Sequence, residues 1–223
     1  LLEAAAHLAA ARGTPRLDLA LVEEAVQQRA LRYDKAGEEH HNVVSAFIKS
    51  MRGSDPDAAL YWLARMIEAG EDPLFIARRM VIFASEDIAT AAPQALPVAG
   101  AARDAVFFVG MPEGRIPLAH AAAYLACAPK SNAAYRAIGL ALDEVRRSGP
   151  LPVPLHLRNA PTQMMKDMGY GSGYRYAHDF PEGVADQQHL PDALRERRFY
   201  EPTENGADAA IAARLQRRRD GDA

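Results

Sequence analysis

The segment RGSDPDAALYWLARMIEAGEDPLFIARRMVIFASED, residues 52–87, decides the fold class. It contains two helix starts of the same construction, an Asp-Pro pair at residues 55–56 and another at 72–73. In each pair a carboxylate that can cap a helix N-terminus precedes a proline at the first helical turn. Apolar residues then recur three and four positions apart, and Gly70 supplies a stop between the two runs. The pattern predicts two consecutive α-helices.

The second of these helices is apolar on nearly every side, which predicts that it is buried. It nevertheless carries four charged residues, Arg78, Arg79, Glu86 and Asp87. Because buried charges are rare unless they are paired, these side chains pair with one another or with a neighbour, or they face a subunit or a nucleic acid. Ion pairing within the domain or across a subunit contact is the favoured interpretation, and Arg79→Ala is expected to damage folding or assembly.

Composition limits the classes of protein to consider. The chain has 223 residues, of which 49% are hydrophobic, so one large core or two small ones are feasible. A formal net charge of −3 gives no overall attraction to nucleic acid, and any phosphate contact needs a local basic patch. The single cysteine, Cys127, excludes an internal disulfide and is expected to be a small buried hydrophobe. Because the sequence begins with Leu1 inside an amphipathic pattern, we expect it to be a piece of a longer protein.

The rest of the chain is predicted to be helical up to about residue 150. No alternation of period two is flanked by hairpin turns, so strands are at most minor and the fold class is all-α. Beyond Gly149 prolines and glycines predict an irregular C-terminal arm, interrupted by a short helix at 162–168 and closed by a helix at 209–219. The other expected helices lie at residues 1–11, after Asp18, at 38–52, after Pro93, after Pro112 and at 131–147, the last capped by Ser131.

No segment predicts an active site. The chain lacks G-x-x-x-x-G-K-[ST], so neither a nucleotide-binding loop nor its Mg²⁺ site is expected, and the glycines at 169, 171 and 173 have the wrong spacing. G-x-S-x-G, the turn that presents a catalytic serine, is also absent. His40 and His41 are adjacent on a helix and should point to different faces, which is poor metal geometry. We therefore expect no catalytic, cofactor-binding or metal-ligating residue in this chain.

What remains is a set of basic residues beside hydrogen-bonding or aromatic ones. Arginine and lysine on phosphates, with tyrosines that stack on bases, would suit single-stranded DNA. The alternative is that these groups tie the arm to the helical domain or to another subunit. The candidate DNA or subunit contacts are Lys49, Arg52, Arg78, Arg79, Lys130, Asn132, His156, Arg158, Lys166, Tyr174 and Arg175.

Several unusual strings make the chain resemble the RarA/MgsA family, the replication-associated recombination AAA+ ATPases related to clamp loaders and to the Werner helicase-interacting ATPase. They are YDKAGEEHHNVVSAFIKSMRGSDPDAALYWLARMIEAGEDPLFIARRM (33–80), ASEDI (84–88), YLACAPKSNAAY (124–135), VPLHLRNAPT (153–162) and MGYGSGYRYAHDF (168–180). The resemblance covers about residues 33–215. One departure is Ala89, where the family usually has glycine. Alanine there predicts that a positive-φ turn is lost and that the helix runs slightly longer.

The resemblance implies an all-α, clamp-loader-collar-like oligomerisation domain that forms homotetramers. Residues 1–30 would be the end of the AAA+ lid subdomain, and 31–223 the helical domain with its arm from about residue 150. The parent protein would be a cytoplasmic, nucleoid-associated, DNA-dependent ATPase in replication-fork maintenance and recombination, with ATP and Mg²⁺ in a domain outside this chain. It would act on single-stranded DNA, ends or gaps.

Two functions stay open for the chain itself. It is either an oligomerisation and DNA-organising module, or a docking module whose arm recruits a replication partner such as single-stranded-DNA-binding protein. Because the chain has no Walker motifs, we expect no ATP turnover from it alone.

Overall fold

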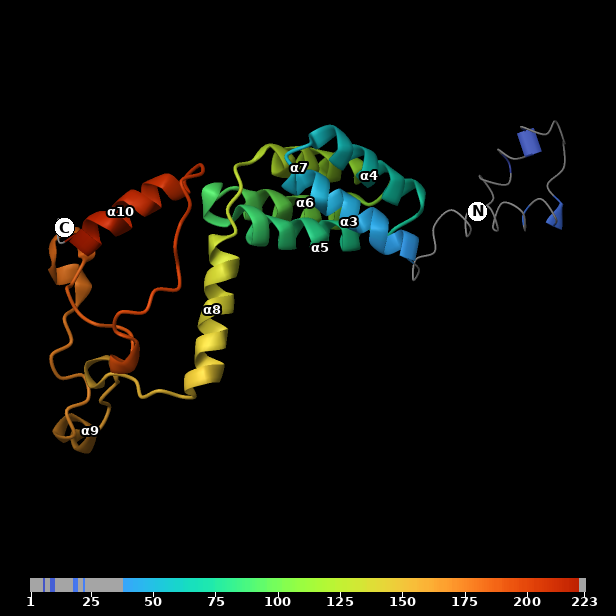
Figure 1. Ribbon diagram of the computed structural model, residues 1–223. Coiled ribbons are helices and arrows are strands. Elements are labelled where there is room, and N and C mark those ends of the chain that lie inside the picture. Colours follow the sequence, from blue (N-terminus) through green and yellow to red (C-terminus); the bar gives the residue numbers. More distant parts are fainter. Residues whose placement is uncertain (1–5, 7–8, 11–17, 20–21, 23–37, 221–223) are drawn as a thin grey trace. The chain divides into compact units, whose positions relative to one another are not determined.

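The computed structural model describes residues 38–220 together with residues 6, 9, 10, 18, 19 and 22 (Figure 1). Predictions for the lid at 1–30 and its helices fall almost wholly outside the described residues. The chain divides into two compact units. The first comprises Leu1–Ile88 and Pro93–Lys130, and the second comprises Ala89–Ala92 and Ser131–Ala223.

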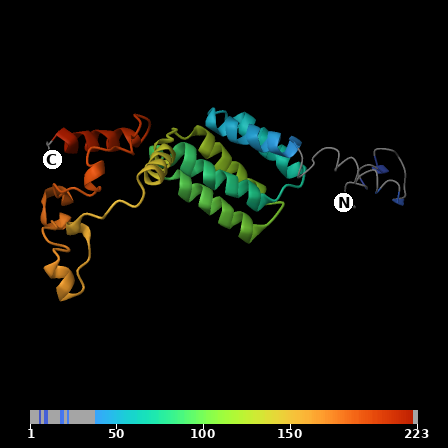
Figure 2. The same cartoon turned by 60° about the horizontal axis from the view of Figure 1, so that its bottom comes forward.

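The described part of the first unit is a bundle of helices packed side by side (Figure 2). Helix α7 contacts α3, α4, α5 and α6, so it forms the centre of the bundle. The elements are α3 (Glu38–Arg52), α4 (Pro56–Glu68), α5 (Pro73–Phe83), the π-helical turn η1 (Ala84–Ile88), α6 (Ala95–Val109) and α7 (Arg115–Cys127).

The two Asp-Pro pairs start helices as predicted. The side chain of Asp55 accepts a hydrogen bond from the backbone N of Ala58 at 2.9 Å, which caps α4. Asp72 accepts one from the backbone N of Leu74 at 2.9 Å and caps α5. Between them, Gly70 has a φ of 76°, a conformation that favours glycine and ends α4. Short-range chemistry therefore determines this part of the bundle.

Large apolar side chains fill the interior of the bundle, and small ones allow its helices to approach closely. Alanines with almost no exposed surface lie on α4, α5, α6 and α7, at positions 59, 77, 99 and 122. The largest fully buried side chains are Phe47, Phe83, Met51, Met66, Ile76, Met80, Ile88, Leu118 and Leu125. This burial supplies most of the stabilisation of the first unit.

The prediction for Ala89 is wrong. Its φ is 45°, so the positive-φ turn is present although alanine occupies the position. The turn leads into the short 3₁₀-helix η2 (Ala89–Ala91), whose last residue is buried in the second unit. Tertiary packing of this segment thus overrides the local preference of alanine for negative φ.

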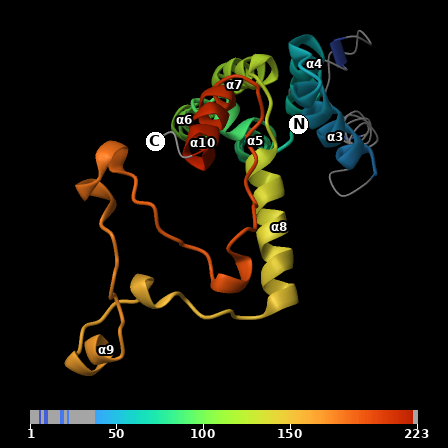
Figure 3. The same cartoon turned by 60° about the vertical axis from the view of Figure 1, so that its left-hand side comes forward.

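The second unit has one long helix at each end and irregular chain between them (Figure 3). Its elements are η2, α8 (Ala133–Ser148), η3 (Leu155–Leu157), α9 (Gln163–Asp167), η4 (Ala177–Asp179), η5 (Pro181–Gly183), η6 (Asp192–Leu194) and α10 (Asp208–Asp220). The predicted irregular arm, the short helix and the final helix are confirmed. No strand occurs between residues 38 and 220, so the all-α fold class is confirmed as well.

A buried carboxylate holds the second unit together. Asp208, at the start of α10, is 0% exposed. Its Oδ2 accepts hydrogen bonds from Ser131 Oγ at 2.5 Å and from the backbone N and Oγ1 of Thr203 at 3.0 Å each. Burial acts to raise the pKa of the Asp208 carboxyl, but hydrogen bonds led by that from Ser131 outweigh it and hold the pKa below its usual value.

Two further bonds join η2 to the chain around Asp208. Thr90 Oγ1 and Tyr200 Oη are 2.9 Å apart, and the backbone N of Ala207 donates to the carbonyl of Ala91 at 2.8 Å. Ser131 was predicted to cap α8, but the N-cap residue is Asn132. The hydroxyl of Ser131 still accepts a hydrogen bond from the backbone N of Ala133 at 3.3 Å while it donates one to Asp208. It therefore links the start of α8 to the start of α10.

None of the helices in the described residues is long and apolar enough to cross a lipid bilayer.

Candidate functional site

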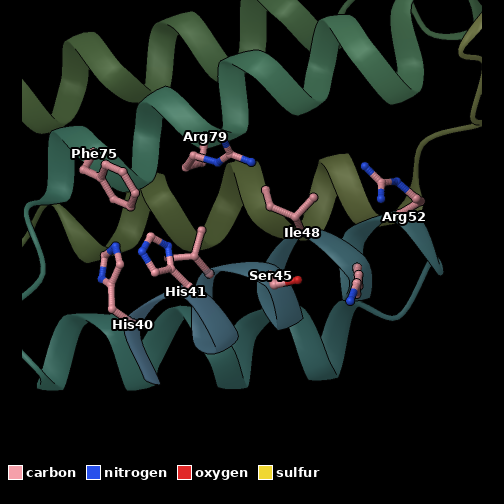
Figure 4. Close-up of a pocket in the computed structure, with 9 residues that line it drawn as sticks. His40, His41, Ser45, Ile48, Arg52, Phe75 and Arg79 are labelled. Carbon is pink, nitrogen blue, oxygen red and sulfur yellow. The ribbon is translucent and has the colours of Figure 1, made fainter. Parts of the chain in front are cut away.

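A cleft of about 460 Å³ opens between α3 and α5 in the first unit (Figure 4). Its apolar surface comes from Val44, Ile48 and Phe75, and Ser45 adds a hydroxyl. Five basic side chains complete the lining, and no carboxylate belongs to it. The basic residues are His40, His41, Lys49, Arg52 and Arg79.

The helical repeat of α3 brings the polar lining into one row. Residues 41, 45, 49 and 52 are separated by four, four and three positions, which places them along one side of a helix. The buried residues of α3 face the bundle, so this row borders the core and opens outward. Lys49 and Arg52, two of the candidate contacts, are both exposed.

His40 is fixed at one end of the cleft. Its Nδ1 lies 2.9 Å from Oε2 of Glu71, and both side chains are buried. The other oxygen of Glu71 accepts from the backbone N of Asp72 at 2.9 Å, so the pair joins α3 to the start of α5. The rings of His40 and His41 touch edge to face, with centroids 5.3 Å apart, while His40 is buried and His41 is exposed. No metal-binding group of three or more ligands occurs among the described residues.

Arg52 closes the other end through an ion pair. Its Nε lies 2.6 Å from Oδ1 of Asp87 and its Nη2 lies 3.0 Å from Oδ2, a two-pronged contact. The hydrogen bond to Asp87 raises the pKa of Arg52. Glu86 lies farther from the same guanidinium, at 3.9 Å. Pairing of Asp87 with a neighbouring element is therefore confirmed, and its partner comes from α3.

Arg78 and Arg79 do not pair with Glu86 or Asp87 in the described chain, so the prediction that these four charges pair with one another is wrong for both arginines. Pairing across a subunit contact stays a prediction. The guanidinium of Arg78 is exposed and lies 6.0 Å from the ring centre of Phe75. Arg79 is half-buried, and its Nε is buried without a hydrogen-bond partner. Among the described residues Arg79 has no ion pair, so its charge is uncompensated within this part of the chain.

Lys130 has a structural role at the end of α7. Its Nζ donates to the carbonyls of Ala126 at 2.8 Å and Ala128 at 2.5 Å, and lies 3.2 Å from Ser54 Oγ. Burial lowers the pKa of the Lys130 ammonium group. This lysine satisfies carbonyls that the helix end leaves unbonded. Asn132, two residues on, is exposed.

Two candidate residues near the start of the arm bond to other parts of the arm. His156 Nε2 lies 2.7 Å from the carbonyl of Gln188. Arg158 Nε donates to the carbonyl of Val153 at 2.7 Å, and its guanidinium lies over the ring of Tyr170, 5.0 Å from the ring centre. These contacts give the arm a fixed conformation although it has little apolar core.

Of the three later candidates in the arm, one bonds within the arm and two are exposed. Arg175 Nη1 donates to the carbonyl of Asp186 at 2.8 Å, and the guanidinium lies 4.4 Å from the ring centre of Phe180. Lys166 and Tyr174 are exposed. Of the candidates, only Lys49, Arg52 and Arg79 are brought together at one site.

Sequence reasoning missed an apolar stripe on α8. Tyr135, Ile138, Leu142 and Val145 are all exposed, and their spacing of three, four and three residues places them on one side of the helix. That spacing is present in the sequence, where only a helix at 131–147 is predicted and no partner face is assigned to it. Ala133 and Glu144 are the buried residues of α8, and the carboxylate of Glu144 lies near Arg147 and Arg197.

A second exposed apolar group lies at the end of α6. Phe107 and Phe108 are adjacent and exposed, the latter at 90%, and Val109, Met111 and Ile116 are exposed close by in sequence. Cys127 is exposed too, so the prediction that it is buried is wrong. Helical periodicity does not distinguish a side chain that fills a core from one that a single chain leaves uncovered.

Comparison with known proteins assigns the chain to a family. Residues 53–219 match the family described as MgsA AAA+ ATPase C terminal, and residues 1–52 match the family described as AAA C-terminal domain. An AAA-domain-containing protein of Mycobacterium tuberculosis is 49% identical over 98% of this chain and 48% of its own length. Replication-associated recombination protein A of Escherichia coli is 48% identical over 87% of this chain and 44% of its own length.

The similarity extends to eukaryotes. The ATPase WRNIP1 of Dictyostelium discoideum is 46% identical over 79% of this chain and 20% of its own length. The chain thus spans about half the length of the bacterial relatives. Because the family match covers most of the sequence, the chain belongs to the MgsA AAA+ ATPase C-terminal family.

Proposed function

We propose that this chain is the self-association and DNA-organising module of an AAA+ ATPase that acts in replication and recombination. Family membership and the names of the relatives support the replication and recombination context. ATP hydrolysis and Mg²⁺ binding belong, in this proposal, to a further domain of the parent protein. The observation that carries the self-association is the exposed apolar stripe on α8.

The stripe has the spacing of a helix–helix seam. Alternating steps of three and four residues place apolar side chains where two helices pack in a coiled coil. Four large side chains on one side of a helix are costly to leave in water, and such patches mark interaction sites. We assign the stripe to a second copy of the chain, because a self-complementary helix face allows the symmetric contacts common in homo-oligomers.

The exposed group around Phe108 supplies a second apolar surface, on the first unit. A closed tetramer of four identical chains can use two different interfaces on each chain, and one apolar surface per unit meets that need. We therefore propose a homotetramer with one contact through α8 and another through the end of α6.

Light scattering coupled to size exclusion tests this assembly at tens of micromolar chain. A particle of four times the 24.3 kDa chain mass is expected. The double substitution Ile138→Glu with Leu142→Glu should reduce the mass, because it places two charges in the α8 contact. Leu140→Glu is the matched control, since Leu140 is exposed on α8 outside the stripe. A strict monomer for the unaltered chain would overturn the proposal.

A second candidate function is a docking module for a replication partner such as single-stranded-DNA-binding protein. Exposed Tyr174 and Tyr176 on the arm favour it, because aromatic side chains are enriched at protein interfaces. Under this alternative, replacing both tyrosines by alanine weakens binding of that partner, measured by calorimetry, and leaves the oligomer mass unchanged. Equal binding of the partner by the unaltered chain and by the double tyrosine variant would eliminate the docking function.

A further inference from the structure

We propose that the cleft between α3 and α5 binds phosphate groups of a single-stranded DNA backbone, with Arg79 at its centre. The inference rests on the DNA-organising part of the proposed function and names a surface for it. Figure 4 shows Arg79 and His41 directed into the same space from the two helices.

Arg79 is the first reason for an anion. Its guanidinium is half-buried on α5, and its Nε is buried without an acceptor. A buried charged donor is unfavourable unless it is hydrogen-bonded, and buried polar groups without partners are few in folded proteins. A phosphate oxygen in the cleft would accept this hydrogen bond. Because a guanidinium can bond two oxygens at once, it suits phosphate in particular.

The charge balance of the cleft is the second reason. The carboxylates at the ends of the cleft are already engaged, Glu71 with His40, and Asp87 and Glu86 with Arg52. Lys49, like Arg79, has no ion pair among the described residues. The part of the cleft lined by Arg79 and Lys49 is therefore positive on a chain whose formal net charge is −3, and its field would attract anions locally.

The row of donors along α3 is the third reason, and it favours a repeating anion over a single one. His41 and Arg52, the first and last of His41, Ser45, Lys49 and Arg52, are 11 residues apart in sequence, which is roughly 16 Å at the helical rise of about 1.5 Å per residue. That length exceeds one phosphate group and accommodates successive groups of a strand. The rings of Phe75 and His41 border the same cleft and offer faces on which bases can stack.

An acidic peptide is the rival occupant, since carboxylates also bind arginine. The geometry favours DNA because a strand supplies both the repeated phosphates and the flat bases that the row and the rings would contact. The peptide is kept as an outcome of the test.

Fluorescence anisotropy with a labelled oligothymidylate, on the 223-residue chain at low salt, is the experiment. Arg79→Gln and Lys49→Gln should each weaken binding about tenfold and reduce the dependence of affinity on salt by about one counterion. Arg115→Gln is the matched control, because it removes the same charge from an exposed site of the first unit outside the cleft. It should change affinity less than about twofold.

Two further measurements separate binding from folding and assembly. Because Arg79 has no ion pair to lose within the described chain, Arg79→Gln should melt at or above the temperature of the unaltered protein, which replaces the sequence-based expectation that loss of Arg79 damages folding or assembly. Its mass by light scattering should equal that of the unaltered chain. A drop in melting temperature of several degrees would identify Arg79 as structural and overturn the proposal.

The remaining outcomes decide the ligand. Competition by millimolar inorganic phosphate supports a phosphate site, and stronger binding of DNA than of free phosphate supports the strand as its source. Displacement of DNA by polyglutamate at lower concentration than by unlabelled DNA would overturn the DNA assignment in favour of an acidic peptide. Equal DNA affinity in the cleft variants and the unaltered chain, or no DNA binding at all, would overturn the site while leaving the tetramer standing.

Discussion

The two units of the molecule are stabilised by different kinds of contact. The first buries large apolar side chains such as Phe47 and Phe83 almost completely. The second has a fully buried carboxylate, that of Asp208, and a nearly buried one, that of Glu144, and its arm is fixed by arginines stacked on aromatic rings. Apolar burial depends little on pH, whereas a charge-centred network does. Substitutions and pH should therefore affect the two units unequally.

The largest effect is expected in the apolar core of the first unit. Phe47→Ala should lower the free energy of unfolding by about 3–5 kcal/mol, because it leaves a cavity where the side chain was 0% exposed. Urea denaturation followed by circular dichroism measures the change. Phe108→Ala is the control, since that ring is 90% exposed and its loss should cost little in the monomer. Similar losses for both would show that the core is not where the structure places it.

The next effect tests the carboxylate of the second unit. Asp208→Ala should lower the free energy of unfolding by about 2–3 kcal/mol, because the donors of Ser131 and Thr203 lose a charged acceptor. Asp208→Asn should cost less, since Oδ1 has no hydrogen-bond partner and an amide nitrogen can occupy its place. Amide hydrogen exchange should increase in the second unit and stay unchanged in α3 to α7. Uniform increases in both units would contradict the comparison.

Acid should act on the second unit before the first. The folded state holds the pKa of Asp208 below the value of about 3.9 that aspartate has in unfolded chains. The stabilisation is therefore complete above that pH and is lost as pH falls through the folded value. Hydrogen exchange between pH 5 and pH 2.5 should show residues 200–210 opening first, and Asp208→Asn should remove this component. A pH-independent second unit would refute the role of Asp208.

A smaller effect is expected at the helix cap that begins α4. Asp55→Ala should cost about 1 kcal/mol, because the backbone N of Ala58 loses its side-chain acceptor. Asp57→Ala is the comparison, since that carboxylate lies in the first turn and contributes only to the helix dipole. Thermal melting of both variants gives the difference in stability. A larger loss of stability for Asp57→Ala would show that Asp55 is not the cap of α4.

The smallest effect has the opposite sign. Ala89→Gly should stabilise the protein by about 0.5–1 kcal/mol, because the φ of 45° strains alanine and not glycine. Ala92→Gly, outside the positive-φ position, should be neutral or destabilising in the same melting experiment. Destabilisation by Ala89→Gly would show that the turn is not strained.

Sequence reasoning succeeded where the determining contacts are local. Both Asp-Pro caps, the stop at Gly70 and the irregular arm follow from residues within one or two turns of each other. The contacts that define the candidate site are not local: Arg52 and Asp87 are 35 residues apart, and α3 meets α5 only after the bundle forms. Lys49, Arg52 and Arg79 were candidates by charge, but their shared cleft depends on helix packing that periodicity does not reveal.

Exposed apolar residues and an imposed backbone angle account for what the sequence did not reveal. Cys127 and the stripe from Tyr135 to Val145 are apolar and helical in pattern, yet exposed. The sequence pattern of an apolar residue is the same whether it is buried within its own chain or exposed at a surface that binds a partner. Ala89 failed because the packing of η2 imposes a backbone angle that its own side chain disfavours.

The long sequence separation between η2 and the residues that it contacts also has a consequence for synthesis on the ribosome. Thr90 meets Tyr200 across 110 residues of sequence. At about 5–20 residues per second, roughly 5–20 s pass between the emergence of these two residues. The helices from α3 to α7 can pack in that interval, whereas the second unit cannot complete its contacts until the residues around Tyr200 and Asp208 have been synthesised. A ribosome stalled before Tyr200 would therefore carry a folded first unit and an unclosed second one, which limited proteolysis of arrested chains would detect.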